Sequence, residues 1–86
     1  METNPKKVII LYVRNVLKLY SSPANPISQT AIANYLNDID VPCDRKTVGR
    51  NIGYLMEFGY PVKKVGSRGY YLTASDIKRT ENKLVI

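Results

Sequence analysis

The sequence predicts an α+β fold with three helices, a two-stranded hairpin and a short final helix. Three observations lead to this prediction. Apolar residues recur at helical spacing in three separate stretches, which indicates amphipathic helices. Farther along the chain, Gly66 and Gly69 separate two short strand-like stretches, which indicates a hairpin with a glycine-containing turn. At 86 residues, the chain has room for one small core.

The first helix is expected at residues 5–20. Asn4 can cap its N-terminus, and the fixed φ of Pro5 suits the first helical position. Two prolines and several small polar residues follow Tyr20 and predict a loop. The apolar stripe of this helix consists of Ile9, Tyr12, Val13, Val16, Leu17 and Tyr20.

The second helix is expected at residues 29–38, with Ser28 as its N-cap and a one- or two-residue strand at Ile27 before it. The third helix is expected at residues 44–58. Asp44 is a suitable N-cap because a carboxylate accepts from backbone N–H groups and favours the positive end of the helix dipole.

Two further signals mark the ends of this third helix. Cys43 and Val48 have the spacing of a hydrophobic staple. Gly59 is expected to end the helix, and Pro61 prevents its continuation. At about 100° per residue, the apolar positions Val48, Ile52 and Leu55 lie within about 40° of one direction and form the expected core face.

The hairpin is expected to have strands at residues 62–65 and 70–73. At least one of Tyr70 and Tyr71 should pack on the helices. Thr73 or Ser75 can cap a final helix that extends to about residue 82 or 83.

A helix pair followed by a two-stranded hairpin is the layout of a winged helix-turn-helix. We therefore expect a winged helix-turn-helix domain over residues 1–74 and a helical tail over residues 75–86.

Composition excludes several classes of function. The single cysteine, Cys43, cannot form an internal disulfide, and the chain has no histidine, so no zinc site of the usual type is expected. We expect no metal, no cofactor and no catalytic residues, since no nucleophile–base motif is present. With no long apolar run and no signal-peptide pattern, we expect a cytoplasmic, nucleoid-associated protein with no membrane contact.

The net charge of +6 is unevenly distributed. Residues 44–72 carry six basic and two acidic residues, a net charge of +4 in a third of the chain. Clustered positive charge favours a polyanionic partner, because phosphate contacts release counterions.

The face of the third helix opposite its apolar stripe has the side chains of a DNA reader. Lys46 and Arg50 can reach guanine acceptors or phosphates, and Tyr54 can donate to a phosphate. The alternative is a basic face that only meets solvent. The candidate contacts on this helix are Arg45, Lys46, Thr47, Gly49, Arg50, Gly53 and Tyr54.

Gly49 and Gly53 each cost about 1 kcal/mol relative to alanine inside a helix. Three explanations stay open: close approach of the helix backbone to DNA, close packing against another helix, or a tolerated weak helix. In the hairpin, Arg68 can enter a minor groove while Lys63 and Lys64 contact phosphates. These charges are equally suited to protecting an exposed edge strand from aggregation.

Three motifs carry a family resemblance: Asp44-Arg45-Lys46-Thr47-Val48, Gly59-Tyr60-Pro61-Val62 and Arg68-Gly69-Tyr70-Tyr71-Leu72. They resemble the N-terminal winged helix-turn-helix of bacterial WYL-domain transcriptional regulators, over residues 8–74. The last motif is also similar to the DNA-binding domain of the biotin repressor. The resemblance implies operator binding by the third helix and the wing, usually as a dimer.

The expected function is therefore sequence-preferring binding of double-stranded DNA by a small transcriptional regulator, such as a repressor, of bacterial, phage or mobile-element type. The recognition helix at 44–58 would enter the major groove, and the wing at 62–72 would contact the minor groove or backbone. A homodimer through the first helix or the tail is expected to add affinity. The alternative is a protein-interaction module, such as a phage-type inhibitor, that binds a protein partner through the same surface.

Overall fold

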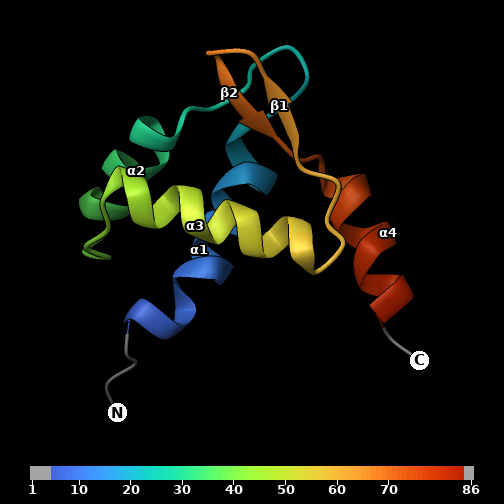
Figure 1. Ribbon diagram of the computed structural model, residues 1–86, viewed down its shortest axis with the longest axis horizontal. Coiled ribbons are helices and arrows are strands. Elements are labelled where there is room, and N and C mark those ends of the chain that lie inside the picture. Colours follow the sequence, from blue (N-terminus) through green and yellow to red (C-terminus); the bar gives the residue numbers. More distant parts are fainter. Residues whose placement is uncertain (1–4, 85–86) are drawn as a thin grey trace.

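The computed structural model describes residues 5–84, and the side chains from Ile9 to Lys83. Its elements follow one another in the predicted order, and the α+β class is confirmed (Figure 1). They are α1 (Pro5–Tyr20), α2 (Gln29–Asp38), α3 (Arg45–Glu57), β1 (Lys63–Val65), β2 (Gly69–Tyr71) and α4 (Ala74–Leu84).

Side-chain caps set the starts of three helices. Ser28, Asp44 and Thr73 each accept a hydrogen bond from the backbone N–H three residues later, at 3.0, 2.7 and 3.1 Å respectively. The predicted caps of α2 and α3 are thus confirmed, and Thr73 is the cap of α4. The predicted cap Asn4 lies outside the described residues, whereas the predicted start of α1 at Pro5 is confirmed.

The predicted stop of α3 at Gly59 is also confirmed. Gly59 has a φ of 99°, and its N–H donates to the carbonyl of Met56 at 3.0 Å. The N–H of Tyr60 donates to the carbonyl of Leu55, also at 3.0 Å. These two bonds form a Schellman motif, in which a glycine accepts the left-handed conformation that reverses the chain.

The core lies where α1 crosses α3, and α1 also contacts α2, α4 and β2. The expected core face of α3, Val48, Ile52 and Leu55, is buried. Cys43 is half-buried and packs against the same cluster, which agrees with its predicted role as a staple. Burial raises the pKa of the Cys43 thiol, and the charge of Asp44 raises it further, so the thiol stays protonated at neutral pH.

The turn between α2 and α3 is held by hydrogen bonds with the last residues of α2. The N–H of Val41 donates to the carbonyl of Leu36 at 2.8 Å. The side-chain amide of Asn37 donates to the carbonyl of Cys43, also at 2.8 Å. Val41 itself is buried in the core. These contacts fix the place at which α3 begins.

The hairpin strands differ from the predicted spans by one residue at the start of each strand and by two residues at the end of the second. Lys63 pairs with Tyr71, and Val65 pairs with Gly69. Leu72 was predicted to continue the second strand, but its N–H donates to the hydroxyl of Ser21 at 3.0 Å, and its side chain is fully buried. The chain leaves the ladder at this point because Leu72 turns into the helical core.

The predicted short strand at Ile27 is present as a single antiparallel bridge to Tyr70. Ile27 and Tyr70 exchange two backbone hydrogen bonds, both 2.8 Å long. Gly69 makes this approach possible, because a Cβ at that position would lie 2.3 Å from the carbonyl oxygen of Ile27. The hairpin is therefore joined directly to the segment that leads into α2.

Helix α4 contacts α1. Its Ile77 is part of the core. Glu81 accepts from Arg14 of α1 at 2.5 Å and from the hydroxyl of Tyr60 at 2.9 Å. The helix begins one residue before the predicted tail, and its inner face belongs to the core of the preceding elements.

None of the helices described between residues 5 and 84 has the length and apolar character needed to cross a membrane.

Candidate functional site

The exposed face of α3 carries the predicted cationic side chains. Arg45, Lys46 and Arg50 are exposed, and Tyr54 is 43% exposed. The two ion pairs among the described side chains are Arg14–Glu81 and Arg79–Asp76, on other parts of the surface. The positive charges of α3 and of the hairpin are therefore not neutralised by ion pairs within the described part of the chain.

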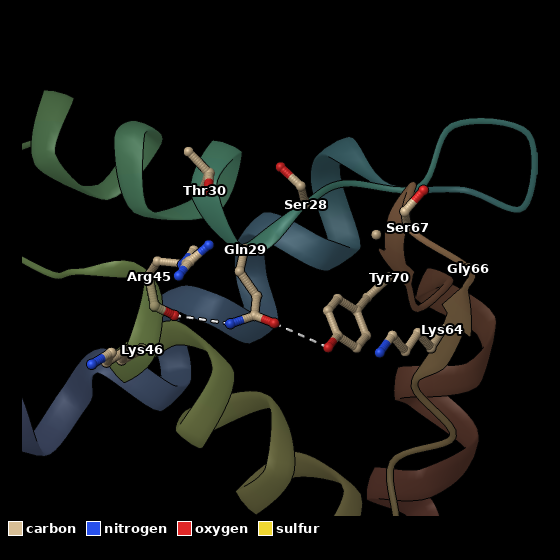
Figure 2. A pocket seen from close by; sticks show the side chains of 10 residues that line it. Ser28, Gln29, Thr30, Arg45, Lys46, Lys64, Gly66, Ser67 and Tyr70 are labelled. Atoms are coloured by element: carbon tan, nitrogen blue, oxygen red, sulfur yellow. Dashed lines mark hydrogen bonds between the residues drawn. The ribbon is translucent and has the colours of Figure 1, made fainter.

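An open cleft of about 490 Å³ lies between the starts of α2 and α3 and the hairpin (Figure 2). Arg45 and Lys46 border it from α3, and Lys64 borders it from β1. The structure thus brings the predicted helix and hairpin residues to one place. The complete lining is Ser28, Gln29, Thr30, Arg45, Lys46, Lys64, Gly66, Ser67, Gly69 and Tyr70.

The other predicted hairpin residues lie outside this cleft. Lys63 is exposed, but as the neighbour of Lys64 in an extended strand it points to the opposite face. Arg68 is exposed at the tip, and its guanidinium donates to the carbonyl of Ala24 at 3.2 Å. The Arg68 side chain therefore turns toward the loop between α1 and α2.

Three other predicted contact residues of α3 border a second depression, next to α1. Arg50, Tyr54 and the half-buried Thr47 line it together with Asp44. The two depressions divide the predicted reading face. Arg45 and Lys46 face the hairpin, and Arg50 and Tyr54 face away from it.

Asp44 reduces the positive charge at the start of α3. The backbone N–H of Thr47 donates to its carboxylate, and this bond is the main reason that the pKa of Asp44 lies below its usual value. The Thr47 hydroxyl and the charges of Arg50 and Lys46 lower the pKa further. The stabilisation from this cap is therefore present at neutral pH and is lost in acid, as the carboxylate is protonated.

Gly49 is explained by packing within the chain. A Cβ at this position would lie 2.4 Å from Nε2 and 3.1 Å from Cδ of Gln29, the first residue of α2. Of the three explanations for this glycine, close packing against another helix is the one with a contact to support it. An alanine here would displace the end of the Gln29 side chain.

Gly53 has a different environment. No atom would lie within 4 Å of a Cβ at this position, so packing among the described residues gives no reason for a glycine. The two explanations left for Gly53 are close approach of a partner and a tolerated weak helix.

We expect Gly53→Ala to raise the free energy of unfolding by about 1 kcal/mol, because alanine has the higher helix propensity and meets open space. Urea denaturation followed by circular dichroism measures this change. Gly49→Ala is the matched control, and its gain should be smaller because Gln29 must move. If Gly53→Ala leaves DNA affinity unchanged, close approach of DNA at this position is excluded.

The structure also brings in residues that the sequence did not single out. Gln29 donates from Nε2 to the carbonyl of Arg45 at 3.0 Å and accepts from the Tyr70 hydroxyl at 3.1 Å. Tyr70 packs partly against the core, so it meets the expectation that a hairpin tyrosine packs on the helices. The sequence contains only a weak signal for the group formed by Gln29 and Tyr70. Ser28 marks the start of α2, and backbone N–H groups at the start of a helix can bind anions.

In the part of the chain from Ile9 to Lys83, no three His, Cys, Asp or Glu side chains gather as metal ligands would. Comparison with protein-family models, with curated proteins and with solved structures found no match. The basis for a functional assignment is therefore the chemistry and placement of the chain's own residues.

Proposed function

We propose that the protein is a winged helix-turn-helix that binds double-stranded DNA as a small transcriptional regulator. One observation carries the proposal: Arg45 and Lys46 from α3 border the same cleft as Lys64 from the hairpin. Two separate elements thus direct cations to one space, as binding to a strand of phosphates requires. The role is one of binding, without catalysis.

The dimensions of α3 suit a DNA groove. Its 13 residues correspond to about 20 Å of helix. The major groove is about 12 Å wide and admits one α-helix. Three long cationic side chains lie in the N-terminal half of α3, which is the part that contacts bases in helix-turn-helix proteins.

The proposal assigns different roles to the two ends of the basic surface. Arg50 lies on the side of α3 away from the hairpin and is the candidate for base contact. Lys46 and Arg45 contact bases or phosphates near the cleft, and Lys64 contacts a phosphate. The hairpin lies over the adjacent backbone or minor groove, with Lys63 and Arg68 at its edge and tip.

We expect Arg50→Ala to weaken binding to a preferred site by about 1–3 kcal/mol and to relax base preference. Lys63→Ala should instead weaken binding to all sequences alike, because a phosphate contact is independent of the base. Fluorescence anisotropy with a preferred duplex and with scrambled duplexes separates these outcomes. If Arg50→Ala weakens all sequences equally, Arg50 is a phosphate contact.

Selection of bound duplexes from a randomised pool tests the proposal as a whole. The expected result is an enriched sequence, with retention of random duplexes at low salt. Failure to bind any duplex at low ionic strength contradicts the proposal. We further propose a homodimer on DNA, which predicts a palindromic site and two chains per duplex in sedimentation velocity.

A protein partner is the second candidate, and exposed apolar side chains favour it. Phe58 is 60% exposed at the end of α3, and Leu19 is 65% exposed on α1. Exposed apolar side chains of this size are available for burial against the apolar surface of a partner. A protein-binding function predicts that Phe58→Ala or Leu19→Ala abolishes binding to the protein partner, while Arg50→Ala leaves this binding intact.

A further inference from the structure

The side chain of Gln29 lies between the two elements of the proposed reading surface. Figure 2 shows it with the start of α3 on one side and the hairpin on the other. Its Nε2 donates to the carbonyl of Arg45, and its Oε1 accepts from the Tyr70 hydroxyl. The amide orientation follows from these partners, since a backbone carbonyl can only accept and Nε2 can only donate.

Glycine at position 49 leaves the space that this amide occupies. A Cβ there would lie 2.4 Å from Nε2 of Gln29, well inside contact distance. Any other residue at position 49 would therefore push the amide away from the Arg45 carbonyl. Glycine lowers the helix propensity of α3 at this position. In return, its missing side chain leaves room for the hydrogen bond from Gln29 of α2 to the Arg45 carbonyl.

The partner of Gln29 in the hairpin is itself fixed in position. The backbone of Tyr70 exchanges two hydrogen bonds of 2.8 Å with Ile27, two residues before Gln29. The ring packs partly against the core, and the hydroxyl reaches Gln29 at 3.1 Å. Strand β2, the start of α2 and the start of α3 are thus linked within a few residues.

From this arrangement, we infer that Gln29 is a positioning residue that holds the start of α3 and the hairpin at a fixed separation. The inference rests on the proposed DNA-binding function. Arg45 and Lys46 lie at one end of the bridge, and Lys64 lies across the cleft near the other. Because the spacing is fixed before binding, the cations of α3 and of the hairpin can contact one duplex with a smaller loss of conformational entropy. Both ends of the Gln29 amide are engaged within the protein.

Three variants separate the parts of this bridge. Gln29→Ala removes both hydrogen bonds. Tyr70→Phe removes the hydroxyl and keeps the ring that packs on the core. Tyr71→Phe is the matched control, because it deletes the same atom from the next residue of β2, which faces the other way. Thermal melting by circular dichroism confirms that each variant is folded before it is compared.

The first measurement needs no DNA. Spin labels are attached at Ser67→Cys on the hairpin and at Glu57→Cys on α3, in a Cys43→Ser background. Double electron–electron resonance then measures the distance between the two labels. We expect a narrow distance distribution that broadens in Gln29→Ala and in Tyr70→Phe and stays narrow in Tyr71→Phe. A distribution that Gln29→Ala leaves unchanged overturns the inference.

The second measurement is affinity for a 20-bp duplex of random sequence, by anisotropy. We expect Gln29→Ala and Tyr70→Phe to weaken binding about tenfold, and Tyr71→Phe to leave it unchanged. Weaker binding without a broader distance distribution identifies a direct DNA contact and overturns the positioning role. A broader distribution with unchanged affinity overturns it as well. A wild-type protein that binds no duplex overturns the proposed function, and the distance distributions then decide the positioning role alone.

Discussion

Raising the NaCl concentration from about 50 to about 200 mM is expected to weaken duplex binding about 1,000-fold. The basic residues at 44–72 number six, and none of them forms an ion pair within the described side chains. If each contacts a phosphate, as is expected on a duplex that lacks the preferred site, binding releases about five condensed cations, and the affinity falls with roughly the fifth power of salt. Anisotropy titrations at four or five salt concentrations give the slope directly.

Charge-matched variants locate the contacts that produce this slope. Lys64→Ala in the cleft should reduce the slope by about one. Lys78→Ala removes the same charge from the exposed side of α4 and should leave the slope unchanged. Equal effects of the two variants would mean that net charge, rather than the cleft, attracts DNA. Binding that is insensitive to salt would contradict a phosphate-based interface.

Gly69→Ala is expected to have the largest effect on stability, a loss of about 3 kcal/mol in the free energy of unfolding. Gly69 has a φ of 131°. A Cβ at this position would lie 2.3 Å from the carbonyl oxygen of Ile27 and 2.7 Å from the backbone nitrogen of Ser28. Both atoms belong to backbone, so no side chain can move aside. The substitution must separate Ile27 from Tyr70 and break their two hydrogen bonds.

A second glycine in the same hairpin provides the control. Gly66 also has a positive φ, of 50°, but no atom would lie within 4 Å of its Cβ. Gly66→Ala should therefore cost only the conformational penalty, about 1–2 kcal/mol. Urea denaturation measures both losses. Equal losses would show that the close approach of Ile27 to the hairpin contributes nothing.

The helices of this chain were predictable because the signals for them are local. A helix start depends on one capping side chain and N–H groups three residues away, as at Ser28 and Asp44. Its buried face depends on spacing alone, as for Val48, Ile52 and Leu55. The strand ends were less predictable, since Leu72 leaves the ladder for a partner at Ser21, about fifty residues earlier.

The candidate site was predictable only in part for the same reason. Its charge and its division between helix and hairpin are visible in the sequence, because they depend on residue type and order. The orientation of Arg68 toward Ala24 depends on a loop that only the fold brings near. The two α3 glycines look equivalent in the sequence, yet one contacts Gln29 and the other meets open space.

By itself, the sequence determined the helices, the caps of α2 and α3, the glycine stop after α3 and the concentration of positive charge at 44–72. All of these depend on residues within a few positions of one another or on composition. Only the tertiary structure decided that Gln29 links Arg45 to Tyr70, and that Lys64 shares a cleft with α3 while Lys63 does not. Those relations join residues that are distant in the chain, and they depend on how helices and hairpin pack, which no local pattern encodes.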